Sequence, residues 1–132
     1  APQIFLNLRE APKVDIALDV QARRLQEGQE NFEVTLQIRC EAKIGTETTA
    51  FIAELVYCGI FTLNGIAPEV MEPVLLVECP RLLFPFARNI LAEVTRDGGF
   101  PPVMLAPIDF VALWQNRRAQ QQMAAAPAQG TA

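Results

Sequence analysis

The sequence has 132 residues, 51% of them hydrophobic, which is enough for one domain with a packed core. Its 15 acidic and 11 basic residues give a net charge of -4, the wrong sign for a surface that neutralises phosphates, so we expect no nucleic-acid partner. No apolar run approaches the roughly 20 residues of a membrane-spanning helix, and without histidine the chain lacks the commonest catalytic base and metal ligand.

Three cysteines, Cys40, Cys58 and Cys79, are widely spaced and form no C-x-x-C pair. An odd number with this spacing fits neither a disulfide framework nor a structural zinc site, so we expect a reducing compartment. Free cysteines pack as small apolar residues. All three are therefore predicted to be buried or half-buried.

Three segments in the first half of the chain alternate in the two-residue period of a β-strand. They are residues 13–22, 32–41 and 47–62. The polar stretch around Gly28 predicts a hairpin between the first two, and a turn at Gly45 precedes the third. The third segment differs from the others because it is apolar on both faces.

The second half of the chain predicts helices. Residues 63–80 hold Gly65, Pro68, Pro73 and Pro80 without a lasting period, which indicates a crossover connection. From Leu82 the period becomes helical until two consecutive glycines end it, and Pro85 is expected in the first turn, where proline is tolerated. After the Pro-rich apolar stretch 99–108, Asp109 is suited to cap a second helix.

Strands followed by helices predict an α+β domain, in which an antiparallel sheet is covered on one face by helix. The remaining chain is too short to cover the second face of the two-sided third strand, so a homo-oligomer is the economical solution. Residues 1–118 are expected to form the domain. The uncharged residues 119–132 are expected to form a disordered, low-complexity tail.

Three groups of residues carry a resemblance to a known family. They are Phe51-Ile52-Ala53-Glu54 with Gly59-Ile60-Phe61, then Cys79-Pro80-Arg81-Leu82-Leu83-Phe84-Pro85-Phe86-Ala87-Arg88, and then Gly99-Phe100-Pro101-Pro102 with Leu105-Ala106-Pro107-Ile108-Asp109-Phe110. Together they resemble the SecB export chaperones. The likeness runs from about Ala1 to Asn116.

The resemblance implies a four-stranded antiparallel sheet with a long helix packed on it and a second, C-terminal helix. The first strand would largely precede Ala1. It also implies a homotetramer built as a dimer of dimers, which holds unfolded secretory precursors in the cytoplasm without ATP and delivers them to the SecA motor. Such a protein is not an enzyme, does not insert into membranes and needs no cofactor or metal of its own.

The resemblance also assigns site residues. A groove for client polypeptides would be lined by Phe51, Phe84, Phe86 and Trp114, with Phe100, Val103, Met104 and Leu105 in the loop that covers it. SecA would contact Ile52 and Glu54 on the outer face of the sheet. Ala53, Leu55 and Tyr57 point the other way on the same strand and would govern the oligomer interface.

Two alternatives remain open from the sequence. A SecB-like chaperone could guard an antitoxin instead of serving export. A dimeric enzyme with a small-molecule pocket could use Glu54 or Asp109 as a base, although no cluster of carboxylates and no glycine-rich phosphate loop supports that reading.

Overall fold

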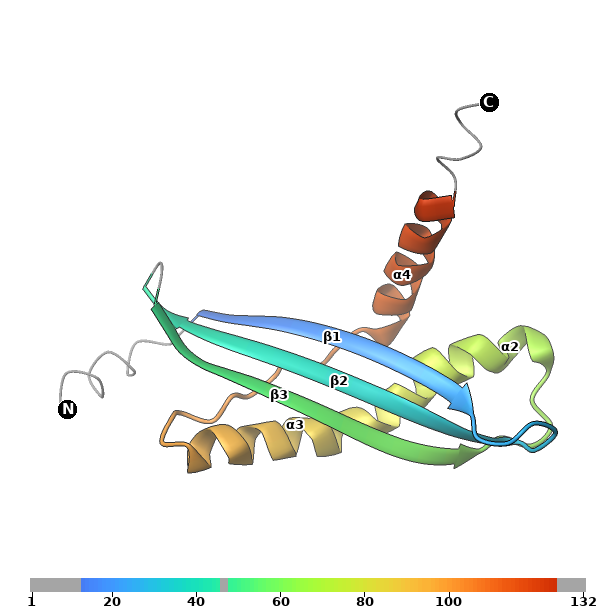
Figure 1. Ribbon diagram of the computed structural model, residues 1–132, viewed down its shortest axis with the longest axis horizontal. Helices are drawn as coiled ribbons and strands as arrows, with labels where there is room; N and C mark the ends of the chain where they lie inside the picture. The colour runs from blue at the N-terminus through green and yellow to red at the C-terminus, as the bar shows by residue number, and fades with distance from the viewer. Residues whose placement is uncertain (1–12, 46–47, 126–132) are drawn as a thin grey trace.

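The computed structural model describes residues 13–45 and 48–125. Three antiparallel strands, β1 (Lys13–Arg24), β2 (Asn31–Ile44) and β3 (Thr48–Thr62), form a sheet in the order β1-β2-β3. The sheet is long and twisted, and the helices lie on one of its faces, as Figure 1 shows. The α+β class predicted from the sequence is confirmed.

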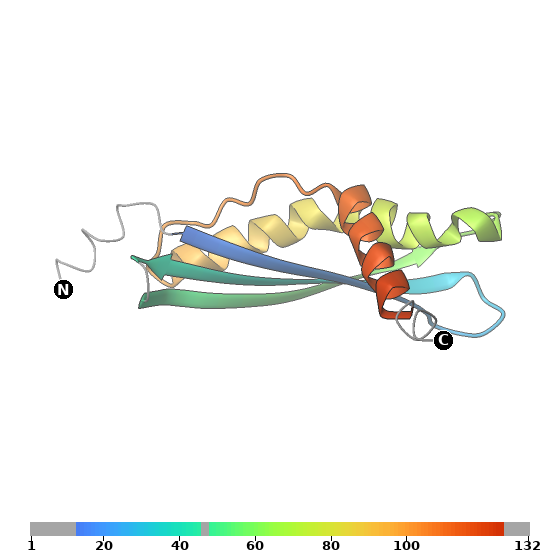
Figure 2. The ribbon, with the colours of Figure 1, turned by 90° about the horizontal axis from the view of Figure 1, so that it is seen from above.

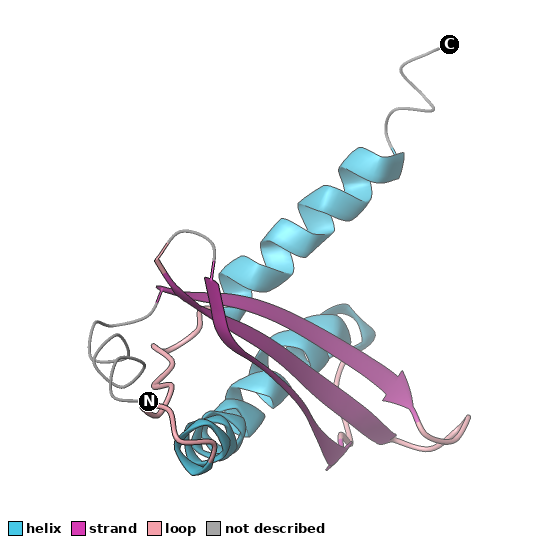
Figure 3. Cartoon of the chain, turned by 60° about the vertical axis from the view of Figure 1, so that its left-hand side comes forward, coloured by secondary structure: helices cyan, strands magenta, loops and turns pink. Residues whose placement is uncertain are grey.

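The helical layer begins with three consecutive segments, α2 (Pro68–Pro73), the π-helical turn η1 (Val74–Glu78) and α3 (Cys79–Asp97). Within η1 the hydrogen bonds skip one residue more than in an α-helix, since the amide of Cys79 donates to the carbonyl of Val74. A connecting loop then runs back along α3 to α4 (Phe110–Ala125), as Figure 2 shows. Helix α4 projects beyond the β1 edge of the sheet (Figure 3).

The core lies between the sheet and the helices. Alternate residues of β2 are buried, and the strand pairing places residues of β1 and β3 beside them on the same face, as Val20 and Tyr57 flank Leu36. Helix α3 contributes Leu83, Phe84, Ala87 and Leu91 from the face that meets the sheet. The inward-facing residues of the strands and the apolar stripe of α3 therefore form one hydrophobic cluster.

Helix α3 packs against β3 at Gly59. A Cβ atom at this position would lie 2.7 Å from Cδ2 of Leu83 and 3.0 Å from Cε2 of Phe61, so a side chain here would force the side chain of Leu83 to shift. Glycine thus permits the close packing of helix on sheet. The contact with Leu83 of α3 therefore accounts for a residue without a side chain in the apolar sequence of β3.

Two expectations about the helices are wrong. The helical region begins at Pro68 and not at Leu82, because proline suits a helix N-terminus. Pro73 and Pro80 lie within the continuous run of α2, η1 and α3 and do not end it. Pro85 lies inside α3 and not in a first turn. The connection that joins β3 to the helical layer is correspondingly shorter than residues 63–80.

Helix α4 extends to Ala125, so residues 119–125 are helical where a disordered tail was expected, and residues 126–132 lie outside the described residues. The first strand implied by the resemblance, which was expected largely to precede Ala1, also lies outside them. Within the described residues, no helix is long and apolar enough to cross a membrane.

Candidate functional site

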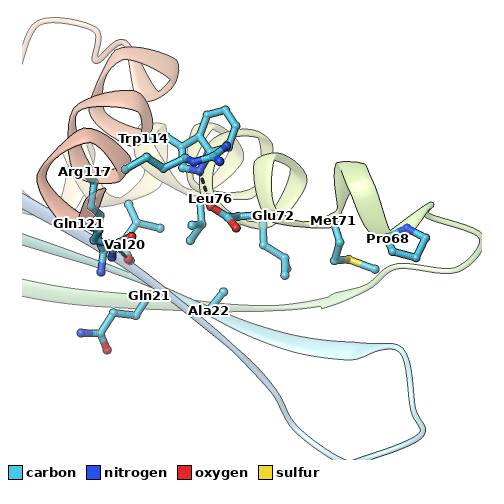
Figure 4. A pocket seen from close by; sticks show the side chains of 12 residues that line it. Val20, Gln21, Ala22, Pro68, Met71, Glu72, Leu76, Trp114, Arg117 and Gln121 are labelled. Carbon is cyan, nitrogen blue, oxygen red and sulfur yellow. Dashed lines mark hydrogen bonds between the residues drawn. The ribbon is translucent and has the colours of Figure 1, made fainter. Parts of the chain in front are cut away.

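A hollow of about 670 Å³ opens between the end of β1, helix α2 and helix α4 (Figure 4). One part of its lining is apolar, with Val20, Met71, Leu76 and Trp114 among its residues. The other part is polar and comes from Gln21, Glu72, Arg117, Arg118 and Gln121. Met and aromatic side chains make large contacts that adapt to different shapes. The hollow therefore offers apolar contacts beside Trp114 within a lining that also carries charged and amide side chains.

Trp114 is held in place from two sides. Its indole Nε1 donates a hydrogen bond of 2.9 Å to Oε1 of Glu72 on α2, which Figure 4 shows as a dashed line. The guanidinium carbon of Arg118 lies 5.1 Å from the centre of its ring, a distance typical of cation–π contacts. The half-buried ring thus has a defined position at the border of the hollow.

Arg117 ties α4 to the sheet. Its guanidinium donates to the backbone carbonyl of Val20 and lies 3.3 Å from Oδ1 of Asp19. The interpretation of the sequence missed both Arg117 and Glu72. Neither has a local signal, because each acts through a residue that is distant in the chain and becomes a neighbour only in the folded protein.

The loop that connects α3 to α4 carries the four predicted covering residues in different settings. The ring of Phe100 contacts that of Phe51, with centroids 4.6 Å apart. Val103 is buried, Leu105 is half-buried and Met104 is 73% exposed. The structure therefore brings Phe51 and Phe100 together and leaves Met104 free to meet another molecule.

The two aromatic residues predicted on α3 point in different directions. Phe84 is buried and packs edge-on against Phe110, with centroids 5.8 Å apart, so it belongs to the core. Phe86 is 60% exposed and stacks on Tyr57, with centroids 6.5 Å apart. Phe86 thus lies beside a predicted oligomer-interface residue, on a side of the helix that Phe84 does not share.

The outer face of the sheet forms a second surface. Ile52 and Glu54 are exposed there, whereas Ala53, Leu55 and Tyr57 are half-buried and face the helices. Two further apolar residues of the same strand, Val56 and Ile60, are 57% and 60% exposed. The alternation predicted for β3 is present, and its outer side is an exposed row of apolar residues with one carboxylate among them.

Glu54 has a fixed neighbour on this outer face. Arg39 is its cross-strand partner in the register of β2 and β3, and Nε of Arg39 lies 3.2 Å from Oε1 of Glu54. The same guanidinium lies 3.4 Å from Oε2 of Glu41. Both side chains of the Arg39–Glu54 pair are well exposed, so the pair contributes under about 1 kcal/mol to stability and mainly orients the carboxylate.

The two carboxylates considered as catalytic bases have other roles or settings. Asp109 caps α4 as predicted, since its Oδ1 accepts a hydrogen bond of 3.1 Å from the amide of Ala112. Glu54 lies on the outer face of the sheet with Arg39. In the part of the chain that the structure describes, no group of three or more His, Cys, Asp or Glu residues is placed to hold a metal ion.

The cysteines fall into two classes. Cys40 and Cys79 are buried, as predicted, but Cys58 is exposed on the outer face beside Thr35, so the expectation of burial is wrong for that residue. Burial raises the pKa of the Cys40 thiol. Burial, with a further contribution from the charge of Glu78, raises the pKa of the Cys79 thiol to about 11.

Iodoacetamide at neutral pH is expected to modify Cys58 in the folded protein and to leave Cys40 and Cys79 unmodified. The reagent attacks the thiolate, and a raised thiol pKa keeps the buried groups protonated and unreactive. Intact-mass spectrometry gives the number of labels, and a urea-unfolded control is expected to take up three. Rapid labelling of Cys79 in the folded protein would contradict this assignment.

Taken together, the hollow beside Trp114 and the exposed apolar row on the outer face are typical of a protein that binds other polypeptides. A family model described as preprotein translocase subunit SecB matches residues 1–121. The chain belongs to the SecB family of protein-export chaperones.

Individual relatives support this assignment. The protein-export protein SecB of Granulibacter bethesdensis is 68% identical over 127 residues, which cover 92% of this chain and 74% of the relative. That of Acidiphilium cryptum is 61% identical, covering 91% of this chain and 80% of the relative. A solved SecB-like chaperone of Mycobacterium tuberculosis, in complex with a peptide from an antitoxin, has a TM-score of 0.65 and covers 76% of this chain and 75% of its own.

These comparisons confirm the resemblance and the role in protein export. SecB is a family of chaperones that bind preproteins, and it is not known as a family of enzymes. The antitoxin alternative is not favoured, because the similar curated relatives are named for protein export. The antitoxin-bound structure is only 13% identical to this chain and therefore supports the fold alone.

Proposed function

We propose that the chain is an ATP-independent chaperone that holds unfolded preproteins in the cytoplasm and delivers them to the SecA ATPase. The observation that carries the proposal is the division of β3 into two faces. One face packs toward the helices and the predicted client residues, and the other exposes Ile52 and Glu54. A client and SecA would then occupy separate surfaces, so that one protein could bind both at once.

Clients would bind on the helix side of the sheet. Trp114 at the hollow, the Phe51–Phe100 pair and the exposed Met104 offer apolar contacts that do not require a particular client sequence. Phe84 and Val103 are buried and would support this surface from below, and Leu105 would border it. An unfolded chain carries many short apolar segments and would engage several such contacts together.

The chain would assemble as a homotetramer, a dimer of dimers, through Ala53, Leu55, Tyr57 and the neighbouring surface of α3. Leu82, Phe86 and Val94 follow one another at four- and eight-residue steps on that helix and are 64%, 60% and 55% exposed. A stripe of this kind is unfavourable in water and is typical of a helix that packs on a partner. Phe86 joins the stripe to Tyr57.

Delay of refolding of a slow-folding preprotein tests the proposal. The wild-type protein is expected to delay refolding at one client per tetramer. Trp114→Ala is expected to weaken binding of a short apolar peptide by roughly 2 to 4 kcal/mol, and binding of a whole precursor by less, because a long client engages several subsites.

Calorimetry measures both affinities of the Trp114 variant. Trp114→Phe is the matched control, since it retains an aromatic ring and loses the hydrogen bond to Glu72. Refolding at an unchanged rate in the presence of the wild-type tetramer would refute the chaperone activity. Equal peptide affinity of wild type and Trp114→Ala would remove Trp114 from the client site.

A further inference from the structure

Thr95, near the C-terminal end of α3, is the buried polar residue of the described core, with 3% of its surface exposed. Its hydroxyl forms hydrogen bonds in two directions. Oγ1 donates to the carbonyl oxygen of Leu91, 2.9 Å away, and the carbonyl oxygen of Ala92 lies 3.1 Å from it as a second acceptor. Oγ1 also accepts a hydrogen bond of 2.9 Å from the backbone amide of Val103. One hydroxyl therefore joins the last turns of α3 to the middle of the connecting loop.

Little else fixes the backbone of this loop. The amide of Phe100 donates to the carbonyl of Thr95, and the next backbone-to-backbone bond along the chain is made by Leu113 in α4. Among the described residues, the bond between Val103 and Thr95 is the one hydrogen bond formed by the backbone of residues 101–108. Three prolines in this stretch supply no amide hydrogen at all.

Among the side chains of this loop, Leu105 and Ile108 are half-buried against the core and Val103 is buried more deeply. Val103 is 8% exposed and belongs to the hydrophobic core, whereas Pro101, Pro102 and Met104 around it are exposed. Val103 is thus the residue of 101–108 at which a buried side chain and a hydrogen-bonded amide coincide. If the attachment of Val103 to Thr95 opened, Val103 would leave the core and the apolar surface beneath it would become accessible.

We propose that Thr95 is a positioning residue whose hydroxyl holds Val103 in place and thereby sets how readily the connecting loop opens for an extended apolar polypeptide. The inference rests on the proposed function, in which this loop covers the client groove. The Thr95–Val103 attachment keeps the loop closed when no client is present. A client gains access when the attachment breaks, and the attachment forms again after release.

The pair Thr95→Val and Thr95→Ser tests the role of the hydroxyl. Valine keeps the shape of threonine but leaves the buried amide of Val103 without an acceptor, whereas serine keeps the hydroxyl and loses a methyl group. A buried hydrogen bond of this kind contributes about 1.4 kcal/mol, which is a factor of ten in an equilibrium. Amide exchange at Val103 is therefore expected to be about tenfold faster in Thr95→Val, and close to the wild-type rate in Thr95→Ser.

Stopped-flow kinetics with a fluorescent apolar peptide provides the second measurement. In Thr95→Val, association and dissociation of the peptide are both expected to be severalfold faster than in wild type, and Thr95→Ser is expected to behave as wild type. A merely structural role would affect the melting temperature of both variants, because each loses a buried group, without separating their peptide kinetics.

Two results would overturn the inference while the chaperone function stands. The first is that Thr95→Val and Thr95→Ser both bind the peptide as wild type does and show equal rates of amide exchange at Val103. The other is faster exchange in Thr95→Val with unchanged peptide kinetics. If the wild-type protein binds no apolar peptide, the proposed client function fails, and the control of access by Thr95 fails with it.

Discussion

Tyr57→Asp is expected to shift the protein from tetramer to dimer. Tyr57 is half-buried on the helix side of β3, and its ring stacks on Phe86, which belongs to the exposed stripe of α3. An aspartate there would place an unpaired carboxylate in an apolar contact, at a cost of several kcal/mol. Light-scattering mass at micromolar concentration measures the change.

Two controls separate assembly from folding in this experiment. Tyr57→Phe keeps the ring and is expected to remain tetrameric. Val56→Asp introduces the same charge one residue away, on the outer face, where Val56 is 57% exposed, and is also expected to remain tetrameric. The interface assignment would be wrong if Val56→Asp dissociated the tetramer as fully as Tyr57→Asp, or if the wild-type protein were a stable monomer.

Glu54→Lys is expected to weaken SecA binding by about tenfold or more and to leave client binding unchanged. The change reverses a charge on an exposed surface, and reversed charges slow encounter and cost affinity at a complementary interface. Glu54 lies on the outer face of β3 and the predicted client residue Phe51 on the other, so the proposed client surface is not altered directly. Calorimetry of both interactions, on samples shown to be tetrameric, gives the two affinities.

Arg39 provides the matched control for that experiment. Glu54→Lys also breaks the ion pair with Arg39 and places two cations side by side, whereas Arg39→Gln breaks the pair and keeps the carboxylate. SecA affinity is expected to remain within a fewfold of wild type in Arg39→Gln. If Glu54→Lys weakened SecA and client equally, the division of the molecule into two binding surfaces would be wrong.

The strands could be predicted closely from the sequence because their signal is local. Alternation along β2 marks every second residue for burial, and those residues form the core of the sheet. The start of the long helix could not be predicted in the same way. Its first turns contain Pro68 and Pro73, which indicate a connection when read alone. In the folded protein they pack on η1 and are joined to α4 by the hydrogen bond between Trp114 and Glu72.

The candidate site was predictable in its residue types and less so in its contacts. Trp114 is recognisable as a large apolar residue on a polar helix, but its hydrogen-bond partner Glu72 is 42 residues away. Arg39 meets Glu54 only through the register of two strands. Phe84 and Phe86 look equivalent in the sequence, yet a difference of two residues turns them to separate sides of a helix.

The π-helical turn η1 lets one continuous helix direct side chains toward two different parts of the molecule. Each residue of an α-helix advances by about 100° around the axis, so the extra residue in a π-turn rotates everything before it relative to everything after it. Before η1, the helix offers Glu72 to Trp114 of α4, and after it, Leu83 and Phe84 meet the sheet. Deleting one residue from the turn would put the two halves out of phase without altering any side chain in either surface. The orientation of Glu72 relative to Leu83 and Phe84 therefore depends on the number of residues in η1. We expect the protein to tolerate substitutions in η1 better than a change in its length.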